Sequence, residues 1–426
     1  MNFKKISIFL YLIITIILIP PSIFATNENT EEINIDSIQN ELIETSSHIE
    51  EVPSINSRAA IVIDRNSKTI LYGKNEQEKR KMASTTKIMT ATIVLENTNL
   101  NDTVEISKKS ANTGGSRLGL KTGDKITVHD LLYGLMLCSG NDAAVALAEH
   151  TAGSVENFAN LMNKKAEELN LLNTHFITPH GLDSDEHYTT AYELAILTDY
   201  ALKNKTFANI VNTKNYSVTI NGFSKTLSNT NELLGNLNGI YGVKTGFTNG
   251  ANRCLVTACK RNDLDIICIV LGADTKKFRT QDSIKLIEYT FNNYQNVNIK
   301  NIIDSNFENW KKNNLSTFII KKGITKNITL SLSNLEYPII PVKKDLINSL
   351  YINIDCTQNL NAPIPKNKKI GNLILYLDNK SVINLDILNT IEIKKKSPLN
   401  YFKHISINYI SYLENIFEKP LIKYWH

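Results

Sequence analysis

Residues 81–90 of this 426-residue chain read KMASTTKIMT, which places Ser84 and Lys87 in an S-x-x-K motif. Two further motifs follow in order, S-G-N at residues 139–141 and K-T-G at residues 244–246. Each motif is a weak signal alone, because S-x-N and K-T-G also occur elsewhere in the chain. Ser84, however, opens the only S-x-x-K. The ordered set of three is therefore a specific signal for one kind of serine acyl-transfer site.

The spacing of Ser84 and Lys87 suits a serine nucleophile with a lysine as its base. A serine hydroxyl is a poor nucleophile at neutral pH unless a neighbouring base accepts its proton. We expect a helix to begin at Ser84, and residues three apart on a helix share one face, with about 5 to 6 Å between their Cβ atoms. The first turn of a helix also favours developing negative charge. Lys87 can act as the base only if burial or a nearby cation lowers its pKa, and Lys244 is the candidate cation.

The residues around the motifs resemble those of the low-molecular-mass penicillin-binding proteins that act as D-alanyl-D-alanine carboxypeptidases. The resemblance extends from about Ser57 to Tyr294 and is carried by residues 81–90, 138–144, 179–182, 187–188 and 242–248. Beyond Tyr294 it becomes weaker, although residues 361–365 and Gly371 are similar to parts of the family's small C-terminal β domain. The resemblance implies a penicillin-binding or β-lactamase-like α/β fold, with a sheet and a helical region. It also implies a serine peptidase that removes the terminal D-alanine from peptidoglycan stem peptides through an acyl-serine intermediate and is inhibited by β-lactams.

The resemblance assigns catalytic roles to three residues. Ser84 would be the nucleophile and Lys87 its base. Ser139 resembles the family's second serine, which passes a proton between the lysine and the leaving amine nitrogen. Asn141 would orient Lys87 and form a hydrogen bond with the substrate amide.

The expected substrate-binding residues follow the third motif. Lys244 and Thr245 offer a cation and a hydroxyl to the terminal carboxylate of the peptide, and Gly246 leaves room for the substrate beside the strand. The backbone amides of Ser84 and Phe247 would form the oxyanion hole, in which one donor contributes on the order of 10² to 10³ in rate. Arg279 lies near the point where relatives have an arginine that helps to bind the carboxylate.

Other features near the motifs have simpler explanations. The second K-T-G, at residues 121–123, precedes Ser139 instead of following it, so we expect it to be a loop. His180, His187 and Tyr188 are expected to hold a loop beside the site and not to take part in catalysis.

Hydrophobic patterning predicts an α/β catalytic domain over residues 58–295. Strands are expected at residues 59–64, 68–72, 241–245, 252–260 and 264–272, and helices at residues 128–137, 143–152, 161–169 and 282–294, in addition to the one that begins at Ser84. Strands at both ends of the segment with helices between them predict a sheet covered by a helical region.

A separate β domain is expected over residues 296–393. Apolar residues there alternate with a period of two, as in Leu373, Leu375 and Leu377 and again in residues 383–387. Asp378-Asn379-Lys380 between these two runs is typical of a hairpin turn.

Both ends of the chain are expected to lie outside these domains. Residues 1–25 have the form of a secretory signal peptide, with two lysines before a short apolar run and Ala25 at a plausible cleavage point. An uncleaved N-terminal anchor is the alternative, and either would mean export to the outer face of the cytoplasmic membrane or the cell wall space. Residues 26–57 contain eight acidic residues and no lysine or arginine, which is typical of a flexible spacer.

The C-terminal tail, residues 394–426, is expected to be an amphipathic helix on a membrane surface. Apolar residues at helical spacing form one stripe, which consists of Phe402, Ile405, Tyr409, Tyr412, Leu413 and Ile416. The tail has six lysines and two glutamates, which favours an anionic lipid surface. No run reaches the roughly 20 apolar residues that span a bilayer. The alternative is a helix packed on the chain's own β domain.

Composition excludes several other classes of protein. The net charge is +5, which suits an anionic surface, but no recognition motif indicates binding to nucleic acid. The five cysteines are scattered and form no C-x-x-C pair, so we expect free thiols, no zinc site and no other cofactor. Cys138 adjoins Ser139, but no histidine or asparagine pattern supports a cysteine nucleophile.

Two other functions share this motif set. A class A β-lactamase needs the glutamate of an E-x-x-L-N motif to activate water. Here residues 169–170 are preceded by Ala166 at that position, with Glu167 and Glu168 out of register, which disfavours this activity. A sensor that is acylated without turnover remains an alternative, although no signalling domain accompanies the site.

Overall fold

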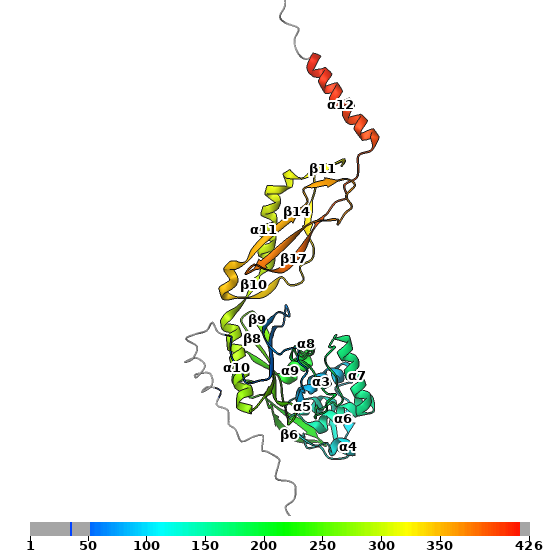
Figure 1. The fold of residues 1–426 in the computed structure, drawn as a ribbon. Helices are drawn as coiled ribbons and strands as arrows, with labels where there is room; N and C mark the ends of the chain where they lie inside the picture. Colours follow the sequence, from blue (N-terminus) through cyan, green and yellow to red (C-terminus); the bar gives the residue numbers. More distant parts are fainter. Residues whose placement is uncertain (1–34, 36–51, 418–426) are drawn as a thin grey trace, which may run out of the picture.

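The computed structural model describes residue 35 and residues 52–417. The expected signal peptide lies outside the described residues, and so do most of the expected spacer and the last part of the tail. The described chain forms an α/β unit, a smaller β-rich unit and a C-terminal helix, which follow one another in Figure 1.

An antiparallel sheet of five strands forms the centre of the α/β unit. The strands are β1 (Ala59–Asp64), β2 (Ile70–Lys74), β7 (Ile240–Thr248), β8 (Asn252–Arg261) and β9 (Leu264–Ala273), in the order β2-β1-β9-β8-β7. The five strands predicted within residues 58–295 are confirmed, although β7 ends three residues later than expected and β2 begins two residues later. The turn before it is longer because Ser67 N and Oγ both donate to Asp64 Oδ2, at 2.6 and 2.7 Å. β7, which carries the K-T-G motif, lies at one edge of the sheet.

Helices cover both faces of this sheet (Figure 1). One face is covered by α3 (Lys87–Asn97), α4 (Lys108–Ala111), α5 (Val128–Met136), α6 (Asn141–Ala152), α7 (Val155–Glu168), α8 (Ala191–Leu202) and α9 (Lys205–Val211), and the other by α10 (Lys276–Asn293). The predictions of α5 and α6 are confirmed, and α6 ends at Gly153, whose φ is +76°. The predictions of α7 and α10 begin six residues late, and α8 and α9 were missed.

Two short ribbons accompany the helical region. β3 (Thr103–Glu105) pairs with β4 (Lys125–Thr127), and β5 (Asn215–Ile220) pairs with β6 (Phe223–Ser228). None of these strands was predicted.

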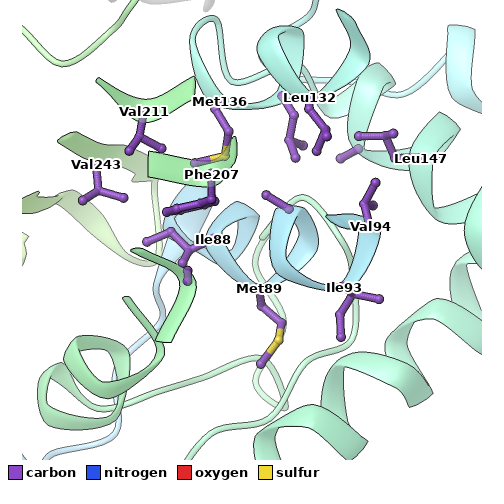
Figure 2. Close-up of a cluster of buried hydrophobic side chains, with 14 of the residues drawn as sticks. Ile88, Met89, Ile93, Val94, Leu132, Met136, Leu147, Phe207, Val211 and Val243 are labelled. Carbon is purple, nitrogen blue, oxygen red and sulfur yellow. The ribbon is translucent and has the colours of Figure 1, made fainter. Parts of the chain in front are cut away.

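The core of the α/β unit surrounds α3. This helix is buried from Lys87 to Val94, so it is covered on every side over its first two turns. Figure 2 shows Ile88, Met89 and Val94 of α3 among apolar side chains from α5, α6, α9 and β7. The base candidate Lys87 is therefore carried by a helix whose first two turns are enclosed by the core.

The β-rich unit contains a four-stranded sheet. Its strands are β12 (Leu330–Leu332), β17 (Lys380–Asn389), β16 (Lys369–Leu377) and β14 (Tyr351–Cys356), in that order. The predicted hairpin is confirmed, because Asp378 and Asn379 join β16 to β17 with φ angles of +47° and +58°, as a type I′ turn requires. Two further pairs complete the unit, β10 (Tyr294–Asn298) with β13 (Ile339–Lys343) and β11 (Ile319–Lys321) with β15 (Asn359–Asn361).

The expectation of β structure throughout this unit is wrong for residues 299–314. They form α11 (Ile299–Asn314), in which Ile299, Ile303 and Phe307 are buried at a spacing of four. This is the spacing of one face of a helix. The sequence therefore contained the signal, but the strands that follow α11 obscured it.

A helix, α12 (Pro398–Phe417), ends the described chain and extends beyond the β-rich unit in Figure 1. Seven of its apolar or aromatic side chains are more than half exposed, and these are Leu399, Phe402, Ile405, Ile407, Tyr409, Ile410 and Tyr412. In the part of the chain that is described, these side chains do not pack on the β-rich unit. No helix among the described residues is long and apolar enough to cross a membrane.

Candidate active site

The nucleophile candidate Ser84 lies in a 3-10 turn, Ala83–Thr86, that leads into α3. The prediction of an α-helix beginning at Ser84 is wrong by three residues, because α3 begins at Lys87. Ala83 has a φ of +48°, and Thr86 Oγ1 donates to Ala83 O over 2.8 Å. The turn therefore presents Ser84 at the entrance to the helix that carries Lys87.

Lys87 is fully buried directly behind Ser84. Its Nζ lies 3.0 Å from Ser84 Oγ, 2.8 Å from Asn141 Oδ1 and 2.9 Å from the backbone oxygen of His180. Burial lowers the pKa of Lys87 well below its ordinary value, and the positive charge of Lys244 lowers it further. A lysine with this pKa can be neutral, and a neutral amine can accept the Ser84 proton across the existing contact.

The second motif brings Ser139 and Asn141 to the same place. Ser139 has a φ of +60° and is buried, while Asn141 is the first residue of α6. The Asn141 side chain links two groups, because Oδ1 accepts from Lys87 and Nδ2 donates to Gly114 O over 2.7 Å. Asn141 therefore fixes both the amine of Lys87 and the loop that follows α4.

Asp142 holds the next part of that loop. Its buried carboxylate accepts from the backbone amides of Leu118, Gly119 and Leu120, at 2.8, 2.7 and 3.0 Å. Sequence reasoning missed this role, because the three amides are more than 20 residues away in the chain and have no side-chain signature.

The third motif packs directly on the nucleophile turn. A Cβ added at Gly246 would lie 3.1 Å from Met82 O and 3.3 Å from Ser84 N. The sequence predicts that Gly246 leaves room for the substrate, but in the structure the nucleophile turn occupies much of that room. The absence of a side chain at position 246 is what lets β7 approach Ser84.

The other residues of the motif face the site from β7. Lys244 is buried, and its Nζ donates to Thr245 O over 3.0 Å. The Thr245 hydroxyl lies 2.8 Å from the hydroxyl of Thr230. Phe247 stacks with Arg253, whose guanidinium carbon is 3.7 Å from the ring centroid.

A cavity of about 540 Å³ opens between these groups. The candidate residues that line it are Ser84, Ser139, Thr245, Gly246, Phe247 and Arg279. Further lining residues, which the sequence did not indicate, include Thr230, Glu232, Arg253 and Lys276. One hydroxyl from each motif, on Ser84, Ser139 and Thr245, therefore faces this opening, whereas Lys87, Asn141 and Lys244 are not among the residues that line it.

Arg279 reaches this cavity from α10. It is 3% exposed and forms an ion pair with Glu232 through Nη2. The cavity thus contains an arginine together with an acidic partner from the segment before β7.

The second K-T-G motif lies elsewhere. Residues 121–123 belong to a turn before β4, where Lys121 N donates to Asp124 Oδ2 over 2.7 Å. Lys121 is exposed and is not among the residues that line the cavity. The prediction of a loop at this position is confirmed.

His187 supports the nucleophile turn from behind. Its Nδ1 accepts from Ile177 N at 3.0 Å, so Nε2 carries the proton and donates to Thr86 Oγ1 at 2.8 Å. Thr86 in turn donates to Ala83 O. Burial lowers the pKa of His187 to about 4, which keeps the ring neutral in this arrangement.

His180 belongs to the same connection, which packs tightly on the turn. Its Nδ1 accepts from Leu182 N at 3.2 Å, and burial and the charge of Lys87 lower its pKa to about 3. The next residue, Gly181, has a φ of +86°, and a Cβ there would lie 2.0 Å from Ala83 O. The expectation that these histidines hold a loop beside the site agrees with this packing.

The cysteines are free thiols in the structure. Cys254, Cys259 and Cys268 are buried, whereas Cys138 and Cys356 are partly exposed. Cys138 Sγ donates to Gly134 O over 3.1 Å, and burial raises its pKa. A thiol with a raised pKa is a poor candidate for a nucleophile.

Two protein families match the sequence of the chain. One, described as D-alanyl-D-alanine carboxypeptidase, matches residues 46–275, and the other, described as the C-terminal domain of penicillin-binding protein 5, matches residues 311–395. D-alanyl-D-alanine carboxypeptidase DacF of Bacillus subtilis is 33% identical over 354 residues, which cover 82% of this chain and 88% of the relative.

The fold is also similar to solved structures of a D-alanyl-D-alanine carboxypeptidase and a DD-transpeptidase. The D-alanyl-D-alanine carboxypeptidase DacD from Francisella tularensis matches with a TM-score of 0.66 and 26% identity, covering 81% of this chain and 95% of that one. The Streptomyces K15 DD-transpeptidase matches with a TM-score of 0.55 and 37% identity, covering 57% of this chain and 99% of that one.

Proposed function

The chain belongs to the family of D-alanyl-D-alanine carboxypeptidases, and from that membership we propose the part that each residue of the site takes in the reaction. As a serine-type hydrolase of this family, it removes the terminal D-alanine from peptidoglycan peptides and acts in the cell wall. An acyl-serine intermediate and sensitivity to penicillin are typical of the family.

In the first step, Ser84 attacks the carbonyl carbon of the penultimate residue and Lys87 accepts the hydroxyl proton. The observation that carries this assignment is the buried Lys87 amine, with its lowered pKa, 3.0 Å from Ser84 Oγ. The backbone amides of Ser84 and Phe247 receive the oxyanion of the tetrahedral intermediate. The close contact of Gly246 with the Ser84 amide supports this pairing of donors.

When the intermediate collapses, the bond to the leaving nitrogen breaks and this nitrogen needs a proton. Ser139 lines the cavity beside Ser84 and passes the proton from Lys87 to the departing D-alanine. Water then attacks the acyl-serine ester, with its proton accepted by Lys87. The shortened peptide leaves with a new carboxylate, and Ser84 recovers its proton.

The terminal carboxylate of the substrate binds where the third motif and Arg279 meet the cavity. Lys244 supplies charge, Thr245 a hydroxyl and Arg279 a guanidinium group. Asn141 holds the amine of Lys87 and binds the substrate amide. Support for this division comes from the positions of Thr245 and Arg279 in the wall of the same cavity as Ser84.

We also propose the domain division given by the sequence: a signal peptide to residue 25, a spacer to 57, a catalytic domain to 295, a β domain to 393 and a membrane-associating tail. In this arrangement the protein is exported and works at the outer face of the membrane. Two features support the membrane-associating tail: the apolar side chains of α12 are exposed, and three lysines precede the helix at residues 394–396. The exposure of these side chains also disfavours packing of α12 on the β-rich unit.

The β-lactamase alternative finds no support in the cavity. Residues 166–168 lie at the end of α7, and none of them is among the residues that line the cavity. The sensor alternative differs in turnover alone, so an activity measurement separates it from the peptidase.

Release of free D-alanine from a diacylated peptide ending in D-Ala-D-Ala tests the function. We expect catalytic release by the wild type, inhibition by penicillin and no release by Ser84→Ala. A single equivalent of D-alanine per enzyme would instead identify the sensor.

A further inference from the structure

An acidic residue shares the cavity in which a substrate carboxylate is expected to bind. Glu232 comes from the segment between β6 and β7, and it lines the same cavity as Ser84 and Thr245. Its Oε1 forms an ion pair with Arg279 Nη2 and accepts from the Thr280 hydroxyl at 2.6 Å. Burial alone would raise the pKa of Glu232, but Arg279 and Thr280 outweigh it and hold the pKa below its ordinary value. The side chain is therefore an anion at neutral pH.

The pair of Glu232 and Arg279 uses only part of its hydrogen-bonding capacity. Within the described structure, the hydrogen bonds of the Arg279 guanidinium all come from Nη2. Arg279 Nε and Glu232 Oε2 are both buried without a hydrogen-bond partner. A guanidinium group binds a carboxylate best through two parallel bonds, so this arginine retains donors for a second acceptor.

A substrate carboxylate that binds Arg279 must come close to the carboxylate of Glu232. Like charges at short range disfavour each other, by an amount that shifts a pKa by about one unit or more. The same repulsion weakens the binding of an anionic substrate group by roughly tenfold. Glu232 is then an internal competitor for the arginine that would receive the terminal carboxylate.

We propose that Glu232 determines how strongly this enzyme selects peptides with a free terminal carboxylate. This inference rests on the proposed function of the cavity. In the unliganded enzyme Glu232 occupies Arg279, and a substrate carboxylate shares the guanidinium group at a cost in affinity. Glu232 therefore reduces the difference in affinity between a peptide with a free C-terminal carboxylate and one with a masked C-terminus. Without Glu232, Lys244, Thr245 and Arg279 would discriminate more strongly between the two.

The test compares two forms of one peptide, with D-Ala-D-Ala ending either in a carboxylate or in an amide. Values of kcat and KM are measured for the carboxylate form, and the affinity of the amide form is measured as competitive inhibition. In Glu232→Gln we expect the KM of the carboxylate form to fall by roughly tenfold with little change in kcat, and the affinity of the amide form to stay the same. Arg279→Gln added to Glu232→Gln should abolish this gain.

The matched control is Glu288→Gln. Glu288 also belongs to an Arg–Glu pair, because it accepts two hydrogen bonds from Arg261 at 2.7 and 2.8 Å. It is not among the residues that line the cavity. Thermal unfolding of each variant checks that it is folded, and Glu232→Ser serves if the glutamine variant does not fold. A rise in KM for the carboxylate form, or an equal change for both peptides, overturns the inference. If the wild type fails to release D-alanine, the proposed function falls, and this inference falls with it.

Discussion

Gly246 of the third motif lies against the backbone amide of Ser84 in the first motif, at a distance that leaves little room for a side chain. This contact fixes the edge strand β7 relative to the nucleophile turn. The amide of Phe247 and the charge of Lys244 are brought to Ser84 and Lys87 by the same strand. Two motifs that are 160 residues apart in the sequence thus form one site because a glycine permits a close approach.

Penicillin should label the protein covalently at Ser84. A β-lactam resembles the D-Ala-D-Ala end of the substrate, and the buried amine of Lys87 is placed to activate this one hydroxyl. Intact mass spectrometry should show the added mass of one penicillin in the wild type and no added mass in Ser84→Ala. Labelling that persists in Ser84→Ala would assign the nucleophile to another residue.

Lys244→Ala should reduce peptidase activity far more than Lys121→Ala. Both lysines open a K-T-G sequence, but Lys244 is buried beside the cavity, whereas Lys121 lies in an exposed turn. Loss of a charge-assisted contact costs about 1.5 to 3 kcal/mol, or roughly one to two decades in kcat/KM. Steady-state kinetics on the D-Ala-D-Ala peptide would measure both variants. Equal losses would mean that the choice between the two motifs is wrong.

The pH dependence of acylation should report the charge of Lys244. Burial and Lys244 together lower the pKa of Lys87, and Lys87 must be neutral to accept a proton. In Lys244→Gln the pKa of Lys87 rises, so the acidic limb of the penicillin acylation rate should move to higher pH. Burial remains, so the shift will be partial. An acidic limb at the same pH in both proteins would show that Lys244 acts on the substrate alone.

The sequence predicted the parts of this protein whose signals are local. The S-x-x-K spacing, the alternation in β16 and β17 and the turn at Asp378 each depend on a few neighbouring residues. The ribbon of β5 and β6 also had a local signal, because Asn221-Gly222 joins the strands with φ angles of +51° and +83°. That signal was present in the sequence and was missed.

The sequence could not predict the contacts that join distant segments. The ion pair between Glu232 and Arg279 spans 47 residues, and the carboxylate of Asp142 binds amides of a loop more than 20 residues away. Neither contact has a periodic or motif signal. They exist because the fold brings the segment between β6 and β7 against α10, and α6 against the loop after α4.

His187 should make the stability of the protein depend on pH. Its pKa in the folded protein is about 4, compared with an ordinary value near 6.5, so between these values the unfolded chain binds a proton that the folded chain does not. The contribution of His187 to the free energy of unfolding is therefore fully present above about pH 6.5 and is lost as the pH decreases toward 4. The slope is about 1.4 kcal/mol per pH unit for one histidine. The free energy of unfolding, measured with urea at several pH values, should depend less steeply on pH in His187→Gln, by this amount. An unchanged dependence on pH would contradict the role of the neutral ring at Thr86.

The tail should attach the protein to anionic membranes. The exposed apolar side chains of α12 can enter the lipid interface, and each well-placed lysine contributes about 1 kcal/mol at an anionic surface. In liposome flotation at low salt, the full chain without residues 1–25 should float with vesicles that contain anionic lipid. A chain that ends at Ile393 should stay in solution. Phe402→Ser combined with Ile405→Ser keeps every lysine, so its loss of flotation would separate apolar insertion from attraction by charge alone. If the full chain also stays in solution, the helix has another role and the proposal of a membrane-associating tail is wrong.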